Sequence, residues 1–303
     1  MSNDFDRREL LAIAGLGGLG VVFGSTIAPP AAAQGYEPAK AGPAEDFFFI
    51  QLSDTHWGFK DDKVNPDAAG TFKKVVGAIN ALSRQPDFIA FTGDMTHTTD
   101  DPAERRRRMA EMRDMIATLK VKDIRFVPGD HDAQKDRGEA YQQFFSKLNY
   151  TFDHKGYHFI VLDNTSDPDQ KLGDAQIAWL AADLKQLKPG TPVVVLTHRP
   201  LFDLYRPWGW WTPDGDKALD LLRPFKPTVF YGHVHHENHT TAMGAVHHAT
   251  TSLMIPVLPA GTRPERTVMP WNAAAPYRGM GWRTVSARGN GAAWDVIGQP
   301  VSG

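Results

Sequence analysis

The sequence predicts an α/β fold, because short apolar runs of strand length alternate with segments of helical periodicity along most of the chain. Most of these runs are apolar on both faces, which is typical of central strands in a sheet that is covered on both sides. A hydrophobic fraction of 42% over 303 residues is enough to bury a real core, which excludes wholesale disorder.

The predicted elements follow one another in a regular order. Glycine, proline and short polar residues separate them, and after Thr240 the pattern changes to short β-like pieces rich in glycine and proline. We expect one domain at residues 46–295, with the proline-rich stretch 256–276 as an extended segment around it. The predicted strands are 47–52, 88–92, 124–127, 157–162, 193–197 and 228–231, and the predicted helices are 67–83, 102–120, 139–148, 174–187 and 215–223.

The N-terminal segment has the pattern of an export signal. Arg7 and Arg8 precede a glycine-rich apolar run at residues 10–27, and small residues up to Ala33 form a cleavage site. The paired arginines predict the twin-arginine export machinery as a partner and a periplasmic location. We therefore expect a signal peptide at 1–33, a linker at 34–45, and no stable membrane anchor after cleavage. The alternative is an uncleaved anchor, although a spanning helix needs about 20 strongly apolar residues.

The composition excludes several classes of site. The chain has no cysteine, which rules out disulfides, cysteine-bound metals and a cysteine nucleophile. A net charge of −2 argues against a nucleic-acid or membrane-surface binder, and the run 105–108 of four arginines, flanked by acidic residues, reads as a solvated helix face. Twelve histidines are left to be explained.

Carboxylates and imidazoles gather at the ends of five predicted strands. In open α/β sheets, ligands bind beyond the carboxyl ends of the strands, so these side chains are expected to meet. A single Gly-Asp pair at a strand end more often forms a turn than supplies a ligand. Five such clusters in order along the chain are hard to attribute to chance. The clusters are Ser53-Asp54-Thr55-His56, Gly93-Asp94-Met95-Thr96-His97, Gly129-Asp130-His131-Asp132, His198, and Gly232-His233-Val234-His235-His236.

Oxygen and imidazole donors without thiolates suit iron, manganese, zinc or similar ions. Three aspartates and four histidines in the best positions are too many for one tetrahedral ion. Two ions about 3.5–4 Å apart that share a carboxylate would use all of them, and such a pair activates a water and neutralises charge on a phosphoester. The sequence therefore predicts two metal ions and phosphoester hydrolysis.

The ordered set resembles the calcineurin-like metallophosphoesterases over residues 47–236. It comprises Asp54-x-His56, Gly93-Asp94, Gly129-Asp130-His131-Asp132, His198 and Gly232-His233-x-His235. The resemblance implies a four-layer αββα sandwich of two mixed sheets, with a dinuclear site at the carboxyl ends of the strands. It also implies a hydrolase in which a hydroxide that bridges the metals attacks the phosphorus of a small phosphoester.

The resemblance further implies a role for each matching residue. Asp54, His56 and His235 would hold the first metal, Asp94 would bridge both, and Asp130, His198 and His233 would hold the second. His131 would contact the phosphate or protonate the leaving oxygen, and Asp132 would orient His131. His97, three residues after Asp94, either faces the phosphate as a substrate-binding residue or caps its turn.

Asp130 departs from the family pattern, which usually has asparagine there. Three aspartates and one hydroxide cancel the charge of two divalent ions, whereas the asparagine site would keep one positive charge. We hypothesise a mixed-valence pair such as Fe(III) with a divalent metal, or a partly protonated Asp130; the other reading is that the exchange has little consequence. The added charge disfavours dianionic monoesters and so favours a phosphodiesterase.

Two questions stay open at this point. The aromatic loop, residues 202–211, either stacks on a flat leaving group of the substrate or packs onto the fold as a hydrophobic plug, and we favour the packing role. A phosphomonoesterase, or a protein on the same scaffold that binds metal or phosphate ligands without hydrolysis, is the alternative function.

Overall fold

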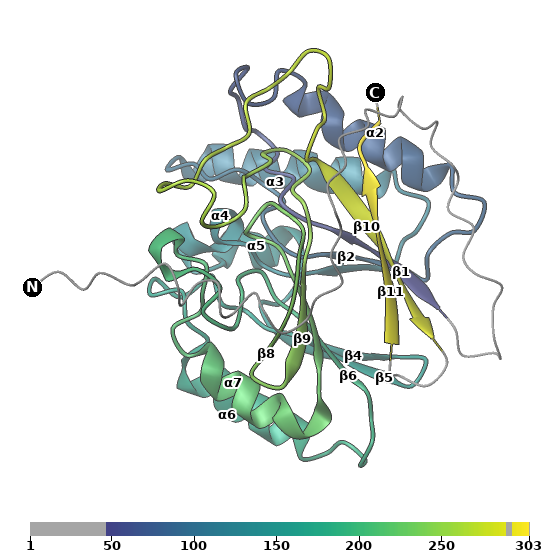
Figure 1. Ribbon diagram of the computed structural model, residues 1–303, viewed down its shortest axis with the longest axis vertical. Helices are drawn as coiled ribbons and strands as arrows, with labels where there is room; N and C mark the ends of the chain where they lie inside the picture. The colour runs from purple at the N-terminus through teal and green to yellow at the C-terminus, as the bar shows by residue number, and fades with distance from the viewer. Residues whose placement is uncertain (1–46, 289–292, 303) are drawn as a thin grey trace, which may run out of the picture. The chain divides into compact units, whose positions relative to one another are not determined.

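The computed structural model describes residues 47–288 and 293–302 (Figure 1). The predicted signal peptide and linker lie outside the described residues. The described chain forms two β-sheets with helices on their outer faces, as Figure 1 shows for α2 and α3 on one side and α6 and α7 on the other. The expected four-layer αββα sandwich of two mixed sheets is confirmed.

The first sheet has the order β11-β10-β1-β2-β3. Its central strands β1, β2 and β3 are parallel, and β10 and β11 add an antiparallel edge. The parallel strands therefore place their carboxyl ends side by side. The bounds are β1 Phe48–Leu52, β2 Phe88–Phe91, β3 Ile124–Phe126, β10 Gly281–Arg288 and β11 Ala293–Pro300.

The second sheet has the order β4-β5-β6-β7-β9-β8. Strands β5, β6, β7 and β9 are parallel, and the antiparallel strands β4 and β8 close the two edges. The bounds are β4 Tyr150–His154, β5 Tyr157–Val161, β6 Val193–Leu196, β7 Thr228–Tyr231, β8 Asn238–Ala242 and β9 Ala245–Ala249.

Helices connect most of the parallel strands. The longer ones pack on the sheets through apolar side chains, and short 3-10 turns follow some of them. Their bounds are α2 Ala68–Asn80, α3 Pro102–Ala117, α4 Asp130–Ala133, α5 Glu139–Phe144, α6 Gly173–Leu184, α7 Gly215–Leu222, η1 Gln134–Asp136, η2 Arg206–Trp208 and η3 Arg223–Phe225.

The alternation of side chains along each strand builds three apolar cores between the four layers. One lies between the two sheets, and the other two lie between each sheet and its helices. In β1, Phe49 points into the core between the sheets, while Ile50 and Leu52 point to the helices α2 and α3. Phe49 and Phe88 stack with ring centroids 4.8 Å apart, and Phe159 of the other sheet meets both rings edge-on. Each buried phenylalanine contributes about 1.5–3 kcal/mol by leaving water. This stiff sandwich fixes the strand ends that carry the polar clusters.

The structure agrees with the six predicted strands to within about a residue at each end. The prediction did not include β4, because its alternating polar residues hide the strand pattern. It also did not include α4, which begins directly at the third polar cluster. The pairing of β10 with β11 continues to Pro300, beyond the expected domain end at residue 295.

The aromatic loop is packed against the fold rather than held free. Trp210 is fully buried, and Trp208 meets it edge-on at 4.9 Å. Phe202 lies against the ring of His247 at 4.5 Å, and Tyr231 and Val234 belong to the same cluster. The structure therefore supports a loop that packs onto the fold over a loop that stacks on a substrate.

The arginine run of α3 is neutralised locally. Arg105 pairs with Asp136 at 2.9 Å, and Arg107 and Arg108 both pair with Glu104 at 2.7 Å. The predicted solvated face is correct for Arg106 and Arg107, whereas Arg105 is buried and the side chain of Arg108 is only 15% exposed. Within residues 47–288 and 293–302, no helix combines the length and the apolar character that a bilayer crossing requires.

Candidate metal centre

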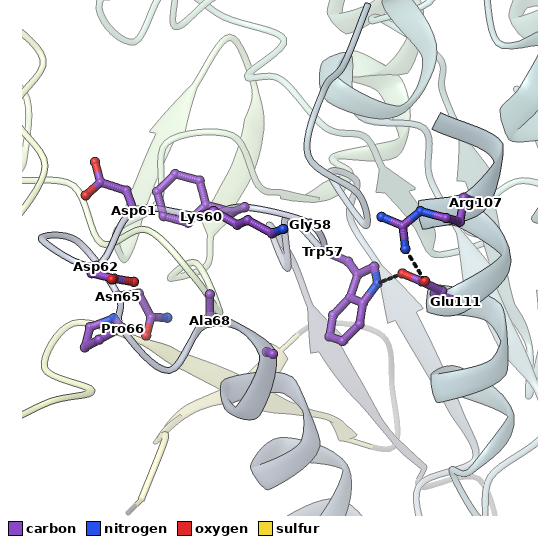
Figure 2. A pocket seen from close by; sticks show the side chains of 12 residues that line it. Trp57, Gly58, Lys60, Asp61, Asp62, Asn65, Pro66, Ala68, Arg107 and Glu111 are labelled. Atoms are coloured by element: carbon purple, nitrogen blue, oxygen red, sulfur yellow. Dashed lines mark hydrogen bonds and ion pairs between the residues drawn. The ribbon is translucent and has the colours of Figure 1, made fainter. Parts of the chain in front are cut away.

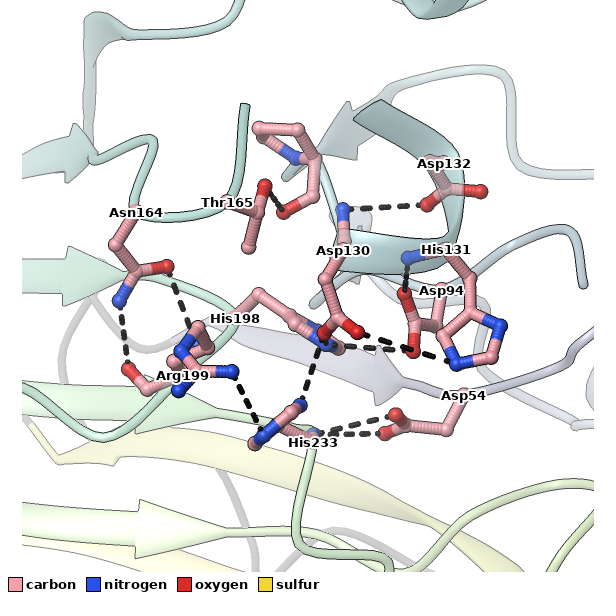
Figure 3. Close-up of polar contacts among 12 residues, drawn as sticks. Asp54, Asp94, Asp130, His131, Asp132, Asn164, Thr165, His198, Arg199 and His233 are labelled. Atoms are coloured by element: carbon pink, nitrogen blue, oxygen red, sulfur yellow. Dashed lines mark hydrogen bonds and ion pairs between the residues drawn. The ribbon is translucent and has the colours of Figure 1, made fainter. Parts of the chain in front are cut away.

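The five polar clusters meet beyond the carboxyl ends of β1, β2, β3, β6 and β7 (Figure 3). The backbone there is strained, because ten non-glycine residues of the described chain have positive φ and half of them belong to these clusters. Such strain persists only where the surroundings enforce it, and it concentrates at functional sites. The five are Asp54, His56, Asp94, His233 and His235, with φ between 42° and 66°.

The first group of side chains comes from the ends of β1, β2 and β7. Asp54, His56, Asp94 and His235 each offer one donor atom, and these atoms lie within 4.8 Å of one another. Nε2 of His235 is 3.1 Å from Oδ1 of Asp54 and 3.1 Å from Nε2 of His56. Its other ring nitrogen, Nδ1, donates to the carbonyl of Ile255 at 2.6 Å. That bond leaves Nε2 free to act as a ligand.

The second group comes from β3, β6 and β7. Asp130, His198 and His233 bring donor atoms together in the same way. Nδ1 of His198 donates to the carbonyl of Thr92 at 2.7 Å, so Nε2 points inward, 3.0 Å from Oδ1 of Asp130. Nδ1 of His233 lies 3.0 Å from the same oxygen.

Asp94 lies between the two groups. Its Oδ2 is 3.6 Å from Nε2 of His56 and 3.4 Å from Nε2 of His198. Its Oδ1 accepts a hydrogen bond of 2.9 Å from the backbone N–H of His131. One oxygen is thus tied to the backbone, and the other faces both groups.

Three glycines allow the clusters to approach so closely. A Cβ on Gly93 would lie 2.2 Å from Nδ1 of His198, and one on Gly129 would lie 2.1 Å from both the backbone N and Oδ1 of Asp94. A Cβ on Gly232 would lie 2.0 Å from Oγ of Ser53. No side chain fits at these positions, so each glycine is required by the packing of the centre.

His131 presents a proton toward the carboxylates. Its Nδ1 accepts a hydrogen bond of 3.1 Å from the backbone N–H of Thr98. In the neutral ring the proton must then be on Nε2, which lies 3.9 Å from Oδ2 of Asp130. The side chain is about a quarter exposed, at 26%, so a substrate can reach it.

Asp132 does not have the role expected from the sequence. Its oxygens accept hydrogen bonds from the backbone N–H groups of Met95, Thr96 and Gly129, at 2.8–3.2 Å. Burial, followed by the charge of Asp94, raises the pKa of Asp132 to about 7. This carboxyl joins the loop after β2 to the loop after β3, and the backbone of Thr98 orients His131 instead. The expectation failed because the helical turn of α4 points neighbouring side chains in different directions.

His97 packs against two rings of the centre. Its Nδ1 lies 3.3 Å from Nδ1 of His56, and its ring is 4.8 Å from that of His131. Burial, with the neighbouring His131, lowers the pKa of His97 to about 4, so the ring is neutral near pH 7. His97 therefore supports the ring of His56, and direct contact with a substrate stays a prediction.

The charge of Asp130 is settled by its neighbours. Burial raises the pKa of Asp130, but the electrostatic interaction with His233 and the hydrogen bonds from His198 and His233 outweigh burial and hold that pKa well below its ordinary value. His198 can donate from both ring nitrogens because, despite burial, Asp94 and Asp130 raise its own pKa well above the ordinary value. In the metal-free chain these contacts favour the ionised form of Asp130, and its protonation in a metal-loaded centre stays a prediction.

Arg199, which directly follows His198, was not singled out by the sequence. It is only 4% exposed, and its Nη1 lies 3.1 Å from Nε2 of His233. Burial lowers the pKa of Arg199, although Asp130 and Asp94 act in the opposite direction. Nothing in the sequence distinguishes it from a surface arginine, because its burial depends on the aromatic loop folding over it.

A pocket of about 560 Å³ lies between the loop after β1 and the helices α2 and α3, and none of its lining residues is a candidate metal ligand (Figure 2). Trp57 and Phe59 line it, and the ring of Phe59 lies 5.2 Å from that of His97. Figure 2 shows Trp57 and Arg107 converging on Glu111, with a bond of 2.9 Å from Nε1 of Trp57. The volume is in the range of small-molecule sites.

Comparisons with known proteins agree with this geometry. A cAMP/cGMP dual specificity phosphodiesterase of Mycobacterium tuberculosis is 28% identical over 170 residues, which is 52% of this chain and 52% of that protein. The chain thus spans about half the length of this relative. A probable cyclic nucleotide phosphodiesterase of Rhodococcus erythropolis is 26% identical over 67% of this chain and 69% of its own.

The fold is shared with a dimetal phosphatase from Danio rerio. That structure has a TM-score of 0.57 at 14% identity, and the match covers 84% of this chain and 99% of the other. The family model described as calcineurin-like phosphoesterase matches residues 49–237, the span that carries all five clusters. The chain therefore belongs to the calcineurin-like phosphoesterase family.

Proposed function

We propose that the protein is a metal-dependent phosphodiesterase that uses two metal ions. The observation that carries this is the convergence of two donor groups on one oxygen of Asp94, at 3.6 Å from His56 and 3.4 Å from His198. The names of the two bacterial relatives support phosphodiesters, and they place cyclic nucleotides among the substrates to be tested.

The donor set fits two ions of the iron, manganese or zinc type. The ligand candidates are carboxylates and imidazoles, and backbone carbonyls hold His198 and His235 with Nε2 turned inward. Asp54, His56 and His235 would hold one ion, Asp130, His198 and His233 the other, and Asp94 would belong to both. When bound, such ions lower the pKa of a shared water and neutralise the charge that develops on phosphorus.

The protein's own groups would orient the ester and handle its proton. His131, held by Thr98, keeps a proton on Nε2 at the open edge of the centre and would give it to the leaving oxygen.

The test compares bis(p-nitrophenyl) phosphate, p-nitrophenyl phosphate and cyclic AMP as substrates of the purified protein. We expect kcat/KM for the diester to exceed that for the monoester, because both bacterial relatives are named as phosphodiesterases. Chelation should abolish turnover, and Mn²⁺, Fe²⁺ or Zn²⁺ should restore it. A preference for the monoester would identify a phosphomonoesterase. No turnover of any ester with any of these metals would identify a protein that binds without hydrolysis.

We also propose that residues 1–33 direct the protein to the periplasm through the twin-arginine route. The support is the sequence pattern around Arg7, Arg8 and Ala33. The full chain should appear in the periplasmic fraction with Gln34 as its new N-terminus, and the double substitution Arg7→Lys and Arg8→Lys should keep it in the cytoplasm. Recovery of uncleaved protein from the membrane fraction would indicate an anchor instead.

A further inference from the structure

Arg199 brings a buried positive charge to the edge of the centre. Its side chain runs from the residue after His198 to the outer side of His233, as Figure 3 shows. Asn164 holds its backbone on both sides, because Nδ2 of Asn164 donates to the carbonyl at 2.9 Å and Oδ1 accepts from the N–H at 3.2 Å. The position of this guanidinium is therefore fixed by the fold.

The contacts of the guanidinium in the described part of the chain carry no negative charge. Nε and Nη2 donate to the carbonyl of Trp211 at 3.3 and 3.1 Å, and Nη2 also donates to the carbonyl of Gly209. Nη1 faces Nε2 of His233, whose Nδ1 is 3.0 Å from Asp130. A buried charge is costly unless an opposite charge compensates it. The nearest such charge along these contacts is the carboxylate of Asp130, on the other side of the His233 ring.

We propose that Arg199 is the charge partner of Asp130 and sets the affinity of the centre for the anionic substrate. Asp130 brings one negative charge and Arg199 one positive charge to opposite sides of the same imidazole. The two charges offset each other, so Asp130 does not by itself call for a trivalent ion. The inference rests on the proposed function.

The direction of each effect follows from the charges. Loss of Arg199 should weaken the binding of phosphate and strengthen the binding of metal, because the guanidinium attracts the anion and repels the cations. Arginine can only donate, so its contact requires a bare Nε2 on His233 and leaves the ring proton on Nδ1.

The experiment uses the full chain in five forms: wild type, Arg199→Gln, Arg199→Lys, Asp130→Asn and the double variant Asp130→Asn/Arg199→Gln. Titration calorimetry measures Mn²⁺ on the chelated protein, and inorganic phosphate on the Mn²⁺-loaded protein. Arg199→Lys keeps the positive charge but loses the planar guanidinium that donates to the carbonyls of Gly209 and Trp211. It is therefore the control for a role limited to anchoring the aromatic loop.

We expect Arg199→Gln to bind phosphate about tenfold more weakly and Mn²⁺ more tightly. Asp130→Asn should shift both affinities the other way, and the double variant and Arg199→Lys should both stay near wild type. Unchanged phosphate affinity in Arg199→Gln would overturn the proposal. Weaker binding of both ligands in Arg199→Gln and Arg199→Lys would also overturn it, because that pattern belongs to an anchor of the aromatic loop.

Melting of the chelated proteins covers the case in which Arg199→Gln is too unstable to load. The proposal expects the double variant to melt at a higher temperature than Arg199→Gln, since removing Asp130 relieves its unbalanced charge. An equal or lower melting temperature would contradict it. A wild-type protein that takes up no Mn²⁺ would refute the proposed function itself, whereas a metal-binding wild type with unaltered variants refutes only the role of Arg199.

Discussion

The substitution His131→Ala is expected to lower phosphodiester turnover by about 10²- to 10⁴-fold, the usual contribution of a positioned general acid. The reason is the hydrogen bond from the backbone of Thr98 to Nδ1, which leaves the ring proton on Nε2 at the open side of the centre. Metal content should not change, because the proposed ligands do not include His131 and its Nδ1 is occupied by the backbone of Thr98, although its ring lies near Asp94 and Asp130. Steady-state kinetics and elemental analysis of the same preparation provide the two measurements.

Asp94→Ala is the matched comparison for this variant. It removes the oxygen that faces His56 and His198, so both metal content and turnover should fall together. If His131→Ala also lost metal, its assignment as an acid would be wrong and it would be a ligand. If it kept full activity, the leaving oxygen would take its proton from elsewhere.

Gly129→Ala is expected to cause the second large effect, a loss of about 3 kcal/mol or more in the free energy of unfolding. The added Cβ would lie 2.1 Å from the backbone N and Oδ1 of Asp94, and backbone cannot move aside as a flexible side chain does. The loops after β2 and β3 must separate, so metal binding should fail as well. Urea denaturation and metal analysis test both consequences.

Gly77→Ala provides the control, because nothing lies within 4 Å of the added Cβ in helix α2. Alanine there should stabilise the protein by about 0.4–1 kcal/mol, since it restricts the unfolded chain and favours the helix. A Gly129→Ala protein as stable as the wild type would show that the loop after β3 can move away from Asp94.

The strand ends were predictable because their signal is local. Runs such as 88–92 are apolar at almost every position, and each is followed at once by a polar cluster. The rule that ligands gather at the carboxyl ends of parallel strands then brings Asp54, Asp94 and His198 together without any distance being known. The pairing of β1 with β2 and of β6 with β7 is the arrangement that this rule requires.

The roles of neighbouring residues were not predictable in the same way. Asp132 and His131 are adjacent in sequence, but α4 turns Asp132 toward the backbone of Met95 and Thr96. His97 lies near the centre as expected, yet its position beside His56 depends on how the loops after β1 and β2 pack. The partner that each side chain of a short turn meets depends on how distant loops pack, which the sequence does not show.

The sequence by itself determined the α/β class, the places where strands end and the residue types that gather there. These features depend on hydrophobic periodicity and on the chemistry of carboxylates and imidazoles, which are local. Only the tertiary structure decided that the pKa of Asp130 is lowered, that Thr98 orients His131 and that Arg199 is buried behind His233. Charge and proton positions depend on burial and on partners far apart in the chain, because the low-dielectric interior makes every unpaired charge costly.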